Sequence, residues 1–212
     1  MIKLKGKPVF GGIVSGRIAF YRRDESVVQK RKIDNPDLEL QRYEYAKACA
    51  LSQLDELYHK AVGEVGENDA GIFLIQQMII KDIDFEKEVR DLIARDHYNA
   101  DYAVAKTARD FSQVLSEMDS DYIKERSADV KDVCDRLIRH IQNKSENNFS
   151  VNEKSIICAD DLVPSETVRL DKSKAAAFCT CYGSSNSHTA ILARTMNIPA
   201  VIGIGTVSYT HL

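Results

Sequence analysis

The sequence predicts an α/β protein in which a helical block is inserted between two strand-bearing ends of the chain. Short apolar segments separated by glycine or polar turn residues occupy both ends, a pattern typical of strands. Between them apolar residues recur at spacings of three and four, the period of a helix with one buried face. A polar stretch, "NKSENNFSVNEKS", follows this block. We therefore expect an α/β domain built from residues 1–33 and 145–212, and a helical subdomain over residues 34–144.

The N-terminal end predicts two strands. The pieces "IKLKGKPVF", residues 2–10, and "GGIVSGRIAFY", residues 11–21, each hold short apolar runs with glycines between them. Glycine gives the backbone the freedom that tight turns need, so we expect strands joined by such turns.

The helical block begins at Asn35-Pro36, where asparagine is a good cap and proline fits the first helical turn. One apolar stripe runs from there to Val62, and it comprises Leu40, Tyr43, Ala46, Ala50, Leu54, Leu57 and Ala61. Gly63, Gly66 and Asn68 break this pattern. The connections between helices are short, which predicts an antiparallel bundle. The remaining helices are expected at 70–80, 85–93, 100–118 and 120–144.

The C-terminal end alternates strand and helix, which indicates an α/β unit. A helix is expected over 190–196, closed by Asn197 and Pro199. The strand-like runs around this helix lie at 155–159, 175–179 and 200–204.

Composition narrows the class of protein. With 44% hydrophobic and 29% charged residues the chain is typical of a soluble globular protein, and no apolar run reaches the roughly 18 residues of a membrane span. A net charge of -3 argues against a general nucleic-acid binder. The N-terminus lacks the features of a secretory signal, and five cysteines in scattered contexts indicate reduced thiols. We therefore expect a cytoplasmic protein without membrane or nucleic-acid partners.

Charge is distributed unevenly along the chain. Residues 1–32 hold nine Lys/Arg against two Asp/Glu, whereas 36–70 hold eight acids against three bases and 82–101 seven against three. Acidic helices are commonly just solvated. They also suit a basic partner protein, because complementary charge raises the rate of encounter.

The stretch "YGSSNSHTAILARTMNIPAVIG" places His188 at the start of the expected helix, with Ser187 or Asn186 as its cap. The unpaired N–H groups and the positive dipole end of a helix start stabilise phosphate. A neutral imidazole there can act as a nucleophile toward phosphorus. Two alternatives are a purely capping histidine and a metal site with nearby cysteines. The Cys179-x-Cys181 spacing is short for zinc, and strand alternation directs both thiols to one face, with the core, so we expect no metal.

The segment "GSSNSHTAILARTMNIPAVIG" resembles the phosphohistidine signature of enzymes that use phosphoenolpyruvate through a swivelling histidine domain. "LVPSETVRLD" is similar to the threonine-bearing segment of that family, and "GIVSGRIAF" to its N-terminal strand. The helical "DSDYIKERSADVKDVCDRLIRHI" resembles Enzyme I of the bacterial sugar phosphotransferase system. The resemblance implies a swivelling β/β/α phosphohistidine domain with an inserted antiparallel helical-bundle subdomain.

The resemblance also implies roles for four residues of the α/β domain. His188 would take a phosphoryl group through Nε2 and give it to a histidine of the phosphocarrier protein HPr. Thr167 would contact the same imidazole and fix its tautomer and position. Ser187 and Thr189, which flank the histidine, would contact phosphoryl oxygens. The helical block would dock HPr, through positions resembling the family's docking face: Glu67, Gln76, Met78, Ile79, Asp82, Asp84, Tyr122 and Arg126. For Met78 and Ile79 core packing is an equally good interpretation.

Full Enzyme I carries a further barrel domain that binds phosphoenolpyruvate and Mg2+ and forms a homodimer. No part of this sequence resembles that barrel, so we expect a fragment, cut off near Val207, that does not use phosphoenolpyruvate by itself and contains no magnesium site. The final "VSYTHL" is unlike the family's continuation, and His211 is given no role. Gly183-Ser184 replaces a Gly-Gly pair common among relatives, and Gln76 stands where a histidine is often found.

Two other functions remain open from the sequence. One is the swivelling domain of a dikinase-type enzyme, which would carry no HPr-docking insert. The other is a non-catalytic paralogue that binds a carrier protein without turnover.

Overall fold

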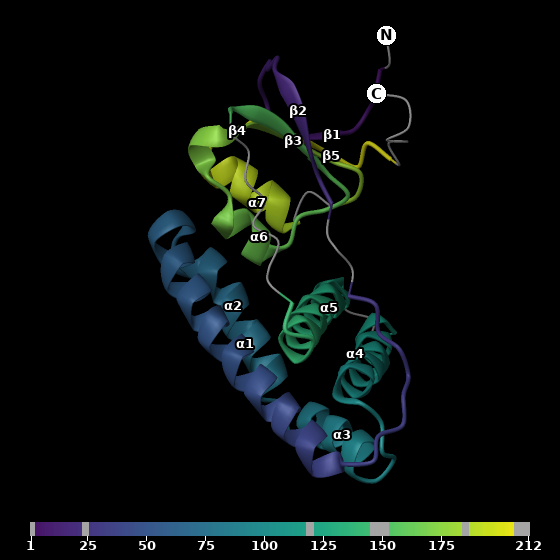
Figure 1. Cartoon of the computed structure of the whole chain (residues 1–212). Helices are drawn as coiled ribbons and strands as arrows, with labels where there is room; N and C mark the ends of the chain where they lie inside the picture. The colour runs from purple at the N-terminus through teal and green to yellow at the C-terminus, as the bar shows by residue number, and fades with distance from the viewer. Residues whose placement is uncertain (1–2, 23–25, 118–120, 145–152, 184–186, 206–212) are drawn as a thin grey trace. The chain divides into compact units, whose positions relative to one another are not determined.

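The computed structural model describes residues 3–22, 26–117, 121–144, 153–183 and 187–205; of 121–128, Lys172 and His188 it describes the backbone and not the side chain. The chain forms two compact units (Figure 1). Unit 1 comprises Met1–Arg23, Lys60–Ala70 and Asn147–Leu212, and unit 2 comprises Asp24–His59 and Gly71–Glu146. Both chain ends contribute to unit 1, and the domain limits near residues 33 and 145 stay a prediction.

Unit 1 is built on a five-stranded sheet in the order β1-β5-β4-β3-β2. The pairs β2–β3, β3–β4 and β4–β5 are parallel, and β1 lies antiparallel to β5 at one edge. The strands are β1 (Lys7–Phe10), β2 (Arg17–Tyr21), β3 (Ser155–Ala159), β4 (Ala175–Thr180) and β5 (Ala200–Ile202). The expected strands at both ends of the chain are thus confirmed.

Helices α6 (Pro164–Arg169) and α7 (His188–Thr195) cover one face of this sheet (Figure 1). Alternation along the strands directs Ile157 and Phe178 to that face, where they are buried against Leu192 and Ala193 of α7. Each helix follows a parallel strand, α6 after β3 and α7 after β4. The loops that lead into both helices therefore begin at the carboxyl edge of the sheet, where α/β proteins commonly place their sites.

Unit 2 is helical, as the apolar spacing predicts. Its helices are α1 (Pro36–Val65, of which residues 36–59 belong to this unit), α2 (Glu67–Ile80, from residue 71), α3 (Ile83–Ala94), α4 (Ala100–Ser116) and α5 (Asp121–Ile141). Asn35 caps α1 through Oδ1, which accepts from Leu38 N at 3.1 Å. α1 continues through Gly63 and ends before Gly66, whose φ of 88° no regular helix accommodates. Of the residues expected to break the helical pattern, Gly66 thus separates α1 from α2, whereas Gly63 lies within α1 and Asn68 within α2.

Side-chain contacts confirm the antiparallel arrangement of α1 and α5. Near the start of α1, Arg42 Nη2 donates to the carbonyl of Ile141 at the end of α5, at 2.9 Å. Further along α1, Gln53 accepts a hydrogen bond from Arg136, which lies earlier in α5. Since the partner numbers fall as the α1 numbers rise, the two helices run in opposite directions. The fold class predicted from the sequence is confirmed.

Candidate functional site

Ser187 and His188 start helix α7 at the carboxyl edge of the sheet. Ser187 has an extended backbone, and its Oγ accepts a hydrogen bond from Ala190 N at 3.3 Å, so the expected cap is confirmed. His188 is the first helical residue, where backbone N–H groups have no carbonyl one turn earlier to bind. An anion near this helix start is stabilised by those N–H groups and by the helix dipole. The His188 side chain itself lies outside the described residues.

Thr189 is completely buried, and its hydroxyl is directed at the loop that follows β3. Thr189 Oγ1 lies 3.3 Å from the Leu162 carbonyl oxygen and 3.5 Å from Asp161 Oδ1. This side chain therefore ties the start of α7 to the β3–α6 loop. The expected contact between the Thr189 hydroxyl and phosphoryl oxygens needs correction, because a fully buried hydroxyl bound to the protein does not face an incoming group.

Thr167 lies on the short helix α6 and is 3% exposed. Its Oγ1 donates to the Pro164 carbonyl at 2.8 Å, so the single hydroxyl proton is already used and the oxygen is left as an acceptor. α6 and α7 are in contact. The helix that carries Thr167 therefore contacts the helix that begins with His188. Direct contact between the two side chains stays a prediction.

Glu166 fixes α6, and the sequence reasoning did not identify it. Its Oε2 accepts from Val163 N at 2.9 Å at the helix start, and its Oε1 accepts from the Tyr21 hydroxyl of β2 at 2.7 Å. Proline at the first helical position followed by glutamate at the third is a sequence signal for a helix start. That signal was present in "PSETV" and could have placed α6.

Gly183, in the loop before α7, has a φ of 116°, which residues with a side chain rarely adopt. A Cβ there would also lie 3.3 Å from Ser187 Oγ, the atom that caps α7. We expect Gly183→Ala to destabilise unit 1 by about 1–3 kcal/mol, because the backbone has to leave this region or bear the strain. Gly16→Ala is the control, since a Cβ at Gly16 meets nothing within 4 Å. Urea unfolding of both variants measures the difference; equal stabilities would contradict the prediction.

The residues expected in the docking face are distributed over both units. Exposed Glu67 starts α2 and belongs to unit 1. In unit 2, Asp82 caps α3, accepting from Asp84 N and Phe85 N, and both Asp82 and Asp84 are exposed. Tyr122 and Arg126 lie on the first turns of α5, and their side chains are outside the described residues.

Gln76 does not lie on a surface, which corrects its expected place in the docking face. Its side chain is 0% exposed, and Nε2 donates to Asp132 Oδ2 of α5 at 2.8 Å. Phe73 and Ile80 are buried three residues before and four residues after it, so all three share the core face of α2. Helical spacing alone could have identified this position as internal.

Met78 is 70% exposed, which rules out the core-packing interpretation for it; Ile79 is half-buried. Two further apolar residues that sequence reasoning missed are exposed nearby in the chain, Leu74 at 40% and Ile83 at 81%. α2 carries more apolar residues than one buried stripe uses, and this excess is the signal that could have found them. Apolar side chains left on a surface with acids beside them are typical of protein-binding faces.

No metal site is formed by the residues that the structure describes: no group of three or more His, Cys, Asp or Glu side chains among them could hold an ion. Cys181 is buried as expected, but Cys179 is only half-buried and lies on the face opposite Phe178. The expectation that Cys179 packs in the core is wrong, because Phe178 occupies the core side of β4.

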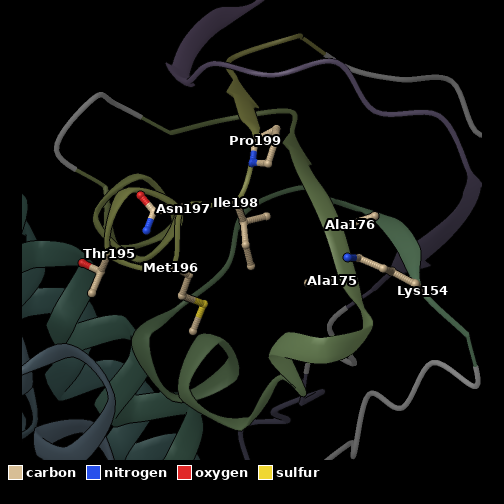
Figure 2. A pocket seen from close by; sticks show the side chains of 8 residues that line it. All are labelled: Lys154, Ala175, Ala176, Thr195, Met196, Asn197, Ile198 and Pro199. Atoms are coloured by element: carbon tan, nitrogen blue, oxygen red, sulfur yellow. The ribbon is translucent and has the colours of Figure 1, made fainter.

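A hollow of about 340 Å³ opens in unit 1 at the far end of α7 from His188 (Figure 2). The last turn of α7 and the start of β4 form its wall together with Lys154; the lining residues are Lys154, Ala175, Ala176, Thr195, Met196, Asn197, Ile198 and Pro199. It is thus separate from the helix start that carries His188.

Within the part of the chain that the structure describes, no helix combines the length and the apolar character that crossing a bilayer takes. Residues 206–212, including His211, and the stretch 145–152 lie outside the described residues.

Two family descriptions match the chain. "PEP-utilising enzyme, N-terminal" matches residues 5–126, and "PEP-utilising enzyme, mobile domain" matches residues 151–211. The first match extends from unit 1 through most of unit 2, and the second contains Thr167 and His188.

Curated relatives agree with these matches. The phosphoenolpyruvate-protein phosphotransferase of Bacillus subtilis (strain 168) is 33% identical over 204 residues, which cover 96% of this chain and 36% of the relative. The protein of the same name from Mycoplasma capricolum is 34% identical over 203 residues, which cover 95% of this chain and 35% of the relative. The chain therefore spans about a third of the length of these relatives.

Solved structures match in fold. An NMR solution structure of Enzyme I (nEIt) has a TM-score of 0.80 at 31% identity, covering 98% of this chain and 85% of that one. The N-terminal domain of Enzyme 1 - Nitrogen, at 21% identity and a TM-score of 0.64, shares the fold over 95% of this chain and 83% of that one. The chain thus belongs to the PEP-utilising enzyme family and is the counterpart of the N-terminal part of Enzyme I.

Proposed function

We propose that this chain accepts a phosphoryl group on His188 and passes it to a histidine of the phosphocarrier protein HPr, and that phosphoenolpyruvate is the donor in the whole protein. The observation that carries the proposal is the place of His188 as the first residue of α7, capped by Ser187. The relatives that are named phosphoenolpyruvate-protein phosphotransferases support the donor. The free cysteines support a reducing compartment, and we place the protein in the cytoplasm.

The reaction needs positioning and charge stabilisation more than added acids or bases. A ring nitrogen of His188 attacks phosphorus, the bond from phosphorus to the donor breaks, and enolpyruvate leaves with the electron pair to become pyruvate on protonation. A histidine nitrogen of the carrier then attacks the same phosphorus, and the bond to His188 breaks. In this proposal the N–H groups at the start of α7 and the Ser187 hydroxyl hold the phosphoryl oxygens, and the position of Ser187 as the cap of α7 supports that role.

Phosphoenolpyruvate binding, magnesium binding and homodimer formation belong, in this proposal, to the part of the relatives that the chain does not match. Magnesium takes oxygen ligands, chiefly carboxylates, and no suitable cluster occurs among the described residues.

The decisive experiment is phosphoryl exchange between the chain and HPr labelled on its histidine. We expect label on His188, stable in base and released in acid as a phosphoramidate is, and reversible on adding unlabelled HPr. Label from phosphoenolpyruvate and Mg2+ alone should stay at background. Absence of exchange with HPr that binds the chain would contradict the relay and favour a non-catalytic carrier-binding protein.

Thr167 is proposed to position the His188 ring. Because its hydroxyl proton goes to the Pro164 carbonyl, Oγ1 can only accept a hydrogen bond from the imidazole. An accepting oxygen holds one ring nitrogen protonated and leaves the other free to attack phosphorus.

Replacing Thr167 with valine is expected to slow exchange about 10–100-fold, the effect of losing one orienting hydrogen bond of about 1–3 kcal/mol. Thr167→Ser keeps the acceptor and should stay within a few-fold of the unchanged chain. The ring 15N shifts of His188 test positioning directly, since the valine variant should show a mixture of tautomers. A slow valine variant with an unchanged tautomer would contradict this role.

The surface formed by Leu74, Met78 and Ile83, called here the α2–α3 face, is proposed to dock HPr. Its three apolar side chains are exposed, and the exposed acids Asp82 and Asp84 adjoin Ile83 in the chain. Such an arrangement suits a partner whose apolar contact patch is surrounded by basic residues.

Met78→Asp is expected to weaken HPr binding about tenfold or more, because an apolar anchor is replaced by a charge that has to be desolvated. Leu38→Asp is the control, since Leu38 is an exposed apolar residue of the same unit, 56% exposed on α1. Calorimetric titration measures both affinities. An equal loss in the two variants, or none in Met78→Asp, would place docking elsewhere.

A further inference from the structure

Two cysteines of unit 1 lie directly opposite each other on neighbouring parallel strands. Cys158 of β3 is the register partner of Cys179 of β4. Both side chains are half-buried, and their strand neighbours Ile157 and Phe178 take the core side. Register and alternation therefore put both thiols on the same, open face of the sheet.

The two thiols belong to one row of side chains that crosses the sheet. Phe20 of β2 is opposite Cys158, and Val201 of β5 is opposite Cys179. These flanking residues are 39% and 37% exposed, so the row is not sealed from solvent among the described residues. A small reagent can thus reach a pair of sulfurs that sits between two apolar side chains.

The geometry of adjacent strands brings the two residues within reach of a covalent bond. Neighbouring strands lie about 4.8 Å apart, and disulfide-linked residues have Cα separations of about 4.4–6.8 Å. Side chains opposite each other in parallel strands point the same way, so their Cβ atoms are about as far apart as the strands, slightly more than the roughly 3.8 Å typical of disulfides. A bond here would draw the strands together locally and would be easily reduced.

The two sulfurs also differ in reactivity. The Cys158 thiol donates a hydrogen bond to the Cys179 sulfur, which lowers the pKa of Cys179 to about 7 and raises the pKa of Cys158. Cys134 of unit 2 shows the ordinary effect of burial, which raises its pKa to about 12. At neutral pH Cys179 is therefore partly thiolate, the form that reacts with electrophiles, while its partner keeps a proton.

We propose that Cys158 and Cys179 form a dithiol site that hydroperoxides oxidise to a disulfide. The Cys179 thiolate attacks the terminal peroxide oxygen, the O–O bond breaks, and a sulfenic acid and an alcohol, or water from hydrogen peroxide, are formed. The Cys158 sulfur then attacks the sulfenic sulfur, the S–O bond breaks, and water leaves with the Cys158 proton. Two thiols are oxidised by two electrons, and one peroxide is reduced.

The test is hydrogen peroxide treatment of the reduced chain, followed by intact mass and peptide mapping. We expect loss of two hydrogen atoms and one cross-linked peptide pair that joins Cys158 to Cys179, both reversed by dithiothreitol. Cys181→Ser and Cys49→Ser should keep the cross-link. Cys158→Ser should abolish it and leave a sulfenic acid at Cys179 that dimedone traps.

The wild-type peptide map alone decides the matter if a variant fails to fold. A cross-link through Cys181, oxidation of Cys179 to sulfinic acid without a cross-link, or reaction no faster than at buried Cys134 would each overturn the proposal. These readouts involve no phosphoryl transfer, so they succeed or fail independently of the proposed function.

Discussion

Replacing His188 with alanine is expected to abolish phosphoryl exchange with HPr, reducing the labelling of the chain at least about 1,000-fold, to background. The imidazole is the only proposed nucleophile, and the hydroxyls and N–H groups around it can hold a phosphoryl group without forming a bond to it. Alanine is a good residue for the first turn of a helix, and the cap made by Ser187 uses Ala190 N, not residue 188. The variant should therefore fold normally.

The same variant separates chemistry from docking. HPr affinity is expected to stay within about twofold, because the substitution lies in unit 1 and leaves every side chain of the α2–α3 face in unit 2 unchanged. His59→Ala is the matched control, since His59 is an exposed histidine on α1 whose Nε2 lies 3.7 Å from Asp55 Oδ2. Exchange by His188→Ala at the wild-type rate would place the phosphoryl group on another residue.

The helix that carries His188 was predictable because its signals are local. Serine before the first apolar residue specifies the cap, and Asn197 and Pro199 specify the end. The structure has Ser187 as the cap and Asn197 with a φ of 54° just after the helix. The sequence signals that predict the strands are equally local. What the residues alone did not supply was the reaction, which came from resemblance to a family.

The wrong predictions for Gln76, Thr189 and Cys179 share another cause: whether a side chain is buried depends on residues far along the chain. Gln76 has a polar side chain, yet α5 covers it and provides Asp132 as an acceptor. Thr189 directly follows the proposed nucleophile in the sequence, yet its hydroxyl donates a hydrogen bond to the carbonyl of Leu162, in the loop after β3. The prediction that Cys179 packs in the core is wrong because sequence alternation shows which residues of a strand share a face without showing which face is inside.

Gln76→Leu is expected to destabilise the helical unit by about 1–3 kcal/mol. Leucine has a similar volume but no donor, so Asp132, only 8% exposed, loses the hydrogen bond that Gln76 Nε2 gives it at 2.8 Å. Hydrogen bonds to charged groups contribute about 1.5–3 kcal/mol. Part of the loss is offset, since Gln76 Oε1 is a buried acceptor that has no hydrogen-bond partner among the described residues, and it disappears in the variant.

Three comparisons make this prediction specific. Gln113→Leu removes a hydrogen bond of the same type from an exposed position, where Nε2 donates to Glu117 Oε1 at 3.0 Å, and should cost below about 0.5 kcal/mol. Gln76→Leu combined with Asp132→Leu should be less destabilised than the sum of the single variants, because neither partner is then left buried and unpaired. Urea unfolding measures the stability of each of these variants. The folded Gln76→Leu variant should bind HPr with the affinity of the unchanged chain. Weaker binding at unchanged stability would contradict the prediction, because it would show that Gln76 contacts HPr and that its hydrogen bond to Asp132 does not persist in solution.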